Sequence, residues 1–371
     1  MLAGGWGWSQ ALVGLQPPLA TGVHGKATLR LHVQPFPEST PMKKSLIAVA
    51  VLGTFAGIAS AQSSVTLYGR IDAGLGKAFG EKSQMQSNYK ETSMLGLRGT
   101  EDLGGGLKAT FNFEQGINTE TGALTGGATG AWNRAAWVGL GGGFGEFQMG
   151  RMTTPQNRTM GVFDLNGSAN NTSALKNLGL DADGSFGGSR ANSQFQYTSP
   201  NFGGFQARAA MVAKADKPEP GVGAADTRKS SYQLAASYKN GPLTVGGVVQ
   251  SKMAEGPNNR TGYALGARYD FPSVMVSALY TQDESRSTGK GFGFGVAVPV
   301  GAMVVGAQVA RVMDNPNPAR EDATAYELFA NYNLSKRTML YAAYGGLDSA
   351  AKVAKGTTGS NTFGLGVVHR F

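Results

Sequence analysis

The stretch SVTLYGRID, residues 64–72, decides the fold because its apolar and polar side chains alternate. Val65, Leu67 and Ile71 fall on one side of an extended chain, and Arg70 falls on the other side with the threonine, the tyrosine and the aspartate. A period of two residues is the signature of a β-strand whose two faces differ. This stretch is therefore predicted to be a strand with one apolar face and one polar face.

The same alternation recurs along the rest of the chain, where a helical period is hard to find. Sixteen segments carry it: 65–79, 89–101, 106–117, 131–140, 144–152, 191–199, 203–214, 228–239, 242–253, 259–270, 273–284, 289–299, 302–313, 322–333, 337–349 and 360–371. A tilted strand needs about 9–11 residues to cross a bilayer, whereas strands of globular proteins average about five or six. Because most of these segments have roughly ten to twelve residues, their length favours strands that cross a membrane.

The connections between these segments also follow a rule. Seven are tight turns rich in glycine, asparagine, aspartate and proline, and they alternate with connections that are mostly longer and more polar. Because unpaired backbone groups in hydrocarbon cost several kcal/mol each, a sheet in a membrane must close on itself. We therefore predict an all-β fold, a sixteen-stranded antiparallel transmembrane β-barrel. The alternative, a large soluble β-sandwich or β-helix, would need charged outer faces, and here one face of most strands is apolar.

Composition excludes several classes of protein and of site. The chain has 371 residues, of which 56 are glycine and none is cysteine, and 15% of its residues are charged. Without cysteine there is no disulfide, no thiol nucleophile and no thiolate metal site. No apolar run of 18 or more residues is present, which argues against a helical membrane protein.

Residues 42–61 have the three parts of a secretory signal peptide. Two lysines are followed by an apolar stretch and by a small-residue cleavage motif. The predicted cut lies between Ala61 and Gln62, and residues 1–41 are then a non-native N-terminal extension. The alternative is a genuine additional N-terminal domain. The predicted mature barrel, residues 62–371, carries 29 basic and 23 acidic residues, a net charge of +6.

Several stretches carry a family resemblance. Besides SVTLYGRID, they are LGLRGTEDLGGGL at 95–107, NRAAWVGL at 133–140, YTSPNFGGF at 197–205 and HRF at 369–371. Together they resemble the general diffusion porins of Gram-negative bacteria, most closely the β-proteobacterial branch. The resemblance implies an outer-membrane homotrimer of sixteen-stranded barrels, surrounded by outer-membrane lipid and lipopolysaccharide. It also implies that Phe371 belongs to the signal that the outer-membrane barrel assembly machinery reads.

The resemblance further implies a pore constriction. Residues 153–190, the longest connection, resemble the third long loop of these porins, which folds into each lumen and narrows it. The loop at about 118–130 resembles the one that latches onto a neighbouring subunit. In the family, basic wall residues face acidic loop residues and create a transverse field. Strand parity and resemblance give a basic side of Arg70, Arg98, Arg134 and Arg190, and an acidic side of Asp164, Glu114, Asp181 and Asp183.

One position departs from the family pattern. The family often has an arginine where this chain has Met94. The positive cluster is then either thinner than usual, or Arg98 and Arg190 compensate for the missing charge. Arg208 also falls on a lumen-facing position.

The predicted function is a water-filled channel for passive diffusion of small hydrophilic solutes and ions, with mild anion preference. A solute-specific channel for anionic metabolites is the alternative, and a surface adhesin or a structural barrel without conduction is a third possibility. His369 is the one histidine after residue 61, and it lies on the lipid-facing parity, so a catalytic triad has no credible base. No enzymatic activity, cofactor or metal is expected, and the scattered basic residues do not suggest nucleic-acid binding.

Overall fold

The computed structural model describes the barrel region of the chain. The described residues are 64–126, 130–180, 188–213, 230–251, 261–283, 289–313 and 322–371. The extension 1–41, the signal peptide 42–61 with its cut at Ala61, and the two aspartates Asp181 and Asp183 lie outside these residues, so those predictions stay predictions. No helix among the described residues is long and apolar enough to span a membrane.

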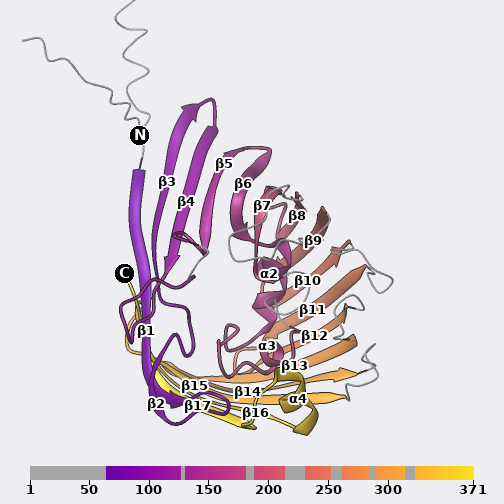
Figure 1. The fold of residues 1–371 in the computed structure, drawn as a ribbon. Coiled ribbons are helices and arrows are strands. Elements are labelled where there is room, and N and C mark those ends of the chain that lie inside the picture. Colours follow the sequence, from indigo (N-terminus) through magenta and orange to yellow (C-terminus); the bar gives the residue numbers. More distant parts are fainter. Residues whose placement is uncertain are drawn as a thin grey trace, which may run out of the picture. The chain divides into compact units, whose positions relative to one another are not determined.

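In the described residues, seventeen strands form one antiparallel sheet, in which every barrel strand pairs with its neighbours along the chain. The strands are β1 (Ser64–Lys77), β2 (Gln84–Ser87), β3 (Met94–Gly104), β4 (Leu107–Gly116), β5 (Ala135–Gly142), β6 (Gly145–Thr153), β7 (Arg190–Thr198), β8 (Phe205–Val212), β9 (Ser231–Asn240), β10 (Leu243–Gln250), β11 (Gly262–Asp270), β12 (Met275–Asp283), β13 (Gly289–Val300), β14 (Met303–Met313), β15 (Ala323–Asn333), β16 (Thr338–Leu347) and β17 (Asn361–Arg370). The short strand β2 pairs with β1 alone. The last strand, β17, pairs with β1 and closes the ring (Figure 1). The remaining sixteen strands therefore make the predicted closed barrel.

Each of the sixteen predicted segments overlaps one barrel strand. The largest difference is at the second segment, predicted to begin at residue 89, where β3 begins only at Met94. Residues 88–93 leave the sheet because Asp72 binds them: its carboxylate accepts the backbone N–H groups of Lys90, at 2.8 Å, and of Glu91, at 2.5 Å. A polar side chain on β1 thus ends the pairing that alternation alone would continue.

The two faces of the sheet differ as the alternation predicts. The apolar side chains of one face are well exposed, for example Val65 (68%), Leu234 (62%) and Leu265 (60%). On the other face of β1, Tyr68 and Arg70 are half-buried among polar partners. A soluble protein would bury such an apolar belt, whereas lipid covers it in a barrel that spans a membrane. We call the two surfaces the apolar face and the polar face.

The connection between β6 and β7 contains short helices that pack against the sheet. They are α2 (Pro155–Met160), η3 (Gly161–Phe163) and α3 (Ala174–Asn177). Thr154 begins α2, because its side-chain oxygen accepts the N–H of Asn157. In Figure 1, α2 and α3 lie beside the strands from β8 to β15, and α2 contacts β9 and β10. A further helix, α4 (Ser349–Lys355), joins β16 to β17 and is capped by Asp348, whose side chain accepts the N–H of Ala351.

Glycines on the sheet let this connection approach the backbone. The ring of Phe163 lies where a side chain at Gly266 would stand, and a Cβ there would come within 2.2 Å of it. In the same way, a Cβ added at Gly293 would lie 2.1 Å from Cδ2 of Leu175, and a Cβ added at Gly291 would lie 2.1 Å from Cδ2 of Leu180. The high glycine content therefore serves close packing as well as turns.

Candidate functional site

The first cluster of charged residues lies where the first and last strands meet. Arg70 on β1 stands directly opposite Arg370 on β17. Glu91 bridges them: one carboxylate oxygen lies 3.2 Å from Arg70 Nη1 and the other 2.5 Å from Arg370 Nη2. Arg70 Nε also donates to the carbonyl of Thr92 at 2.8 Å. Two guanidinium groups therefore share one carboxylate on the polar face.

A second cluster follows on β1, β3 and β4. The guanidinium carbon of Arg98 lies 4.8 Å from the ring centroid of Tyr68, at cation–π distance. The Tyr68 hydroxyl donates to Glu114 Oε1 at 2.8 Å, and Glu114 Oε2 lies 3.5 Å from Arg134 Nε. The predicted basic residues Arg98 and Arg134 and the predicted acidic residue Glu114 are thus brought together, with Tyr68 between them.

A third group of arginines lines a polar cavity of about 360 Å³. Its described lining includes Arg134, Arg151 and Arg190, together with threonine, serine and asparagine side chains. Arg151 is held by the backbone oxygen of Asn133, at 2.6 Å from its Nε, and by the side chain of Asn192 at 2.5 Å. Three permanently charged guanidinium groups converge there, and such a concentration of positive charge attracts anions.

Asp164 lies apart from these arginines, in a buried polar cluster with 3% of its surface exposed. Its carboxylate accepts hydrogen bonds from Ser173 Oγ at 2.5 Å and from Gln308 Nε2 at 2.9 Å. Gln308 also donates to Glu327, a fully buried carboxylate on β15 that accepts from Asn166 Nδ2 at 2.6 Å. These contacts tie the β6–β7 connection to β14 and β15.

Lys90 joins this cluster from the connection between β2 and β3. Its ammonium donates to the backbone oxygen of Asn166 at 2.9 Å and to the side-chain oxygen of the same residue. Burial lowers the pKa of Lys90, and the nearby carboxylates, led by Glu327, oppose this shift. The next residue back, Tyr89, stacks on Tyr341 at a centroid distance of 6.3 Å, and burial raises its pKa.

Sequence reasoning missed Glu91, Arg151 and Arg370 as members of the site. Arg151 and Arg370 were within reach, since both belong to family-like stretches and Arg370 lies on the polar parity. Glu91 could not be predicted, because it lies on the connection between β2 and β3, where the two-residue alternation of a strand does not apply. At the departure from the family pattern, Met94 pairs with Arg70 on one side while Arg370 pairs with it on the other. Arg370 on β17 therefore places a positive charge beside Arg70, whereas the position on β3 that carries an arginine in the family is occupied here by Met94.

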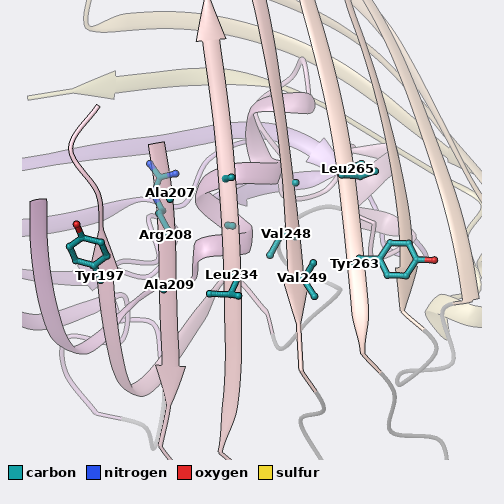
Figure 2. A pocket seen from close by; sticks show the side chains of 12 residues that line it. Tyr197, Ala207, Arg208, Ala209, Leu234, Val248, Val249, Tyr263 and Leu265 are labelled. Atoms are coloured by element: carbon teal, nitrogen blue, oxygen red, sulfur yellow. The ribbon is translucent and has the colours of Figure 1, made fainter. Parts of the chain in front are cut away.

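The apolar face carries a groove of about 800 Å³ over β7 to β11 (Figure 2). Small side chains such as Ala207 and Ala209 lie between larger ones such as Leu234 and Leu265. Its one charged lining residue, Arg208, bonds instead to Gln206. Because the groove offers so few donors and acceptors, it does not suit a hydrophilic solute, and the charged clusters of the polar face remain the candidate site.

Comparisons with known proteins agree with this geometry. The sequence profile of a family described as Gram-negative porin matches residues 48–352. Outer membrane porin protein 32 of Delftia acidovorans is 35% identical over an alignment of 318 residues, and the match covers 81% of this chain and 88% of the relative. An outer membrane porin protein of Bordetella pertussis is 29% identical over 393 residues, covering 89% of this chain and all of the relative.

A solved structure is similar as well. The anion-selective porin from Comamonas acidovorans matches with a TM-score of 0.67 and 31% sequence identity, over 84% of this chain and 100% of that one. The sixteen-stranded closed barrel, its apolar outer belt and these likenesses lead to one conclusion. The chain belongs to the Gram-negative porin family and is a β-barrel of the Gram-negative outer membrane.

Proposed function

We propose that this porin is a passive channel for small hydrophilic solutes and ions that mildly prefers anions and carries out no reaction. One observation carries the anion preference. Among the described residues, the three arginine groups bring together six arginines (Arg70, Arg98, Arg134, Arg151, Arg190 and Arg370) and two carboxylates (Glu91 and Glu114). An excess of positive charge along a narrow aqueous path raises the local anion concentration. The solved relative described as anion-selective supports the same sign.

We also propose that residues 153–190 narrow the lumen, with Arg70, Arg98, Arg134 and Arg190 on the basic side of the constriction. The contacts of Phe163, Leu175 and Leu180 with strand glycines support this proposal. On the acidic side, Glu114 is the candidate among the described residues that contacts an arginine, Arg134. Asp164 acts as an anchor of the connection, since its oxygens are engaged by Ser173 and Gln308. Asp181 and Asp183 stay candidates for the acidic side.

Assembly and processing are further parts of the proposal. The signal peptide 42–61 is removed between Ala61 and Gln62, residues 1–41 are not part of the mature protein, and 62–371 assemble as a homotrimer. Phe371 is read by the assembly machinery, and lipid and lipopolysaccharide surround the barrel. N-terminal sequencing of the protein from outer membranes tests the cut, and the migration of the unheated protein on a gel tests the trimer.

The reversal potential in a KCl gradient across a planar bilayer tests the function. An anion-selective sign is expected, and a clear cation-selective sign would refute the proposal. The double variant Arg134→Ala/Arg190→Ala is expected to lose most of the preference, whereas Lys336→Ala/Arg337→Ala removes the same two charges from an exposed turn and serves as the control for charge alone. Absence of conductance would favour a structural barrel or adhesin. Saturable block of the current by one anionic metabolite would favour a solute-specific channel.

A further inference from the structure

The connection between β2 and β3 is built into the barrel at the place where β1 and β17 meet. Residues 88–93 are held by Asp72, whose two carboxylate oxygens take the N–H groups of Lys90 and Glu91 and the hydroxyl of Tyr341, the last at 2.8 Å. Asp72 itself is fully buried. The backbone at Glu91 therefore has a fixed position on the polar face.

A second set of contacts locks the same segment from the other side. The backbone oxygen of Lys90 accepts the N–H of Asn170 at 3.0 Å, and that of Tyr89 accepts the N–H of Asn171 at 3.2 Å. The ammonium of Lys90 reaches Asn166. Because the β6–β7 connection and β1 both hold this segment, the backbone of Glu91 cannot move away from the arginines without breaking several hydrogen bonds.

Glu91 lies between two arginines whose positive charges would otherwise repel each other. Arg70 and Arg370 are direct partners in the antiparallel register between the first and last strands. Like charges in such a pair repel each other. The carboxylate between them removes one of the two positive charges from the local sum. Water still reaches the group, since 26% of the Arg70 side chain and 43% of the Arg370 side chain are exposed.

We propose that Glu91 sets how strongly the channel prefers anions, as a specificity-determining residue that neutralises half of the positive charge at the strand junction. This rests on the proposed function. The expected size follows from one unit charge acting over roughly 6 Å at the dielectric constant of water, which changes the local concentration of a monovalent ion about threefold at low salt. The effect shrinks as the ionic strength rises, because salt screens the charge.

The central experiment is the reversal potential of Glu91→Gln in dilute and in concentrated KCl gradients. Glutamine keeps the shape and one accepting oxygen but removes the negative charge. The anion-to-cation permeability ratio is expected to rise by about two- to threefold in dilute salt and much less in concentrated salt. Glu81→Gln is the matched control, since it makes the same charge change at an exposed position of the preceding connection, between β1 and β2. A ratio unchanged from that of the control would overturn the proposal.

Arg370→Gln separates charge from structural loosening and remains informative if Glu91→Gln does not fold. It removes one positive charge, so the ratio is expected to fall by a similar factor, and the double variant is expected to return toward the wild type. A loosened barrel would instead move both single variants in the same direction, which contradicts the proposal. A cation-selective wild type would refute the proposed function alone, because the difference between Glu91→Gln and the wild type is measured independently of the sign.

Discussion

Replacing Gly266 by alanine tests whether the β6–β7 connection depends on a close fit to the strands. A Cβ at this position lies 2.2 Å from Cδ2 and 2.4 Å from Cε2 of Phe163, whereas ordinary contacts begin at 3.4 Å. The ring, which is 1% exposed, must therefore retreat by about 1.2 Å, the difference between 3.4 and 2.2 Å. Overpacking of this kind costs typically 1–3 kcal/mol.

This cost appears as a change in the population of the docked connection. A shift of 1–3 kcal/mol raises the share of the undocked form by about 5- to 150-fold. We expect Gly266→Ala to increase the mean single-channel conductance and the current noise, because the connection then leaves its place more often. Gly161→Ala is the matched control, since Gly161 has φ −61° and no heavy atom within 4 Å of an added Cβ.

A double-mutant cycle gives the decisive comparison. Phe163→Ala alone removes the ring and is also expected to raise conductance. In the Gly266→Ala background the same change relieves the clash, so the two effects are expected to be strongly non-additive. If Gly266→Ala conducts like the wild type and the two changes simply add, the close fit between ring and glycine does not hold the connection in place, and the reasoning is wrong.

Three further predictions concern the polar clusters and the chain end. Glu327→Gln puts an amide donor where the carboxylate accepts from neighbouring groups at 2.6–2.8 Å, so a loss of about 1–3 kcal/mol in thermal unfolding is expected, and a change below 0.5 kcal/mol would contradict it. Burial lowers the pKa of Lys90 in the folded state below its ordinary value of 10.5. Just below pH 10.5 the unfolded chain therefore binds more protons than the folded chain, and the free energy of unfolding rises with pH. The variant Lys90→Met is expected to flatten this rise when unfolding is measured as a function of pH. An unchanged pH slope would exclude Lys90 as its source. Phe371→Ala is expected to lower the yield of folded barrel in the outer membrane, because the ring packs on Gly69 and the chain end pairs with that residue at 3.1 Å; normal yield would refute this role.

Strands were predictable from the sequence because alternation is a local property. A residue such as Leu67 faces lipid because its neighbours two positions away do so, and the register with the next strand changes nothing in that pattern. The short helices were not predictable, since α2 has six residues and α3 has four, too few for a helical period to emerge.

The site was predictable in part for a related reason. Arg70, Arg98 and Glu114 lie on strands, where parity gives the face on which each side chain lies. Glu91 lies on a connection whose position depends on Asp72, and nothing in the sequence distinguishes Asp72 from any other polar-face residue. Asp164 is engaged by Gln308, more than a hundred residues away, and such pairs have no signal in a single sequence.

The glycines that receive the β6–β7 connection have a consequence for the order of assembly. Gly266, Gly291 and Gly293 lie on β11 and β13, roughly a hundred residues downstream of the side chains that rest on them. Contacts so distant along the chain form late, after the intervening loops have closed. While the first half of the sheet is forming, the strands that the β6–β7 connection packs against are therefore not yet in place. The connection reaches its final position only after β11 and β13 have joined the sheet.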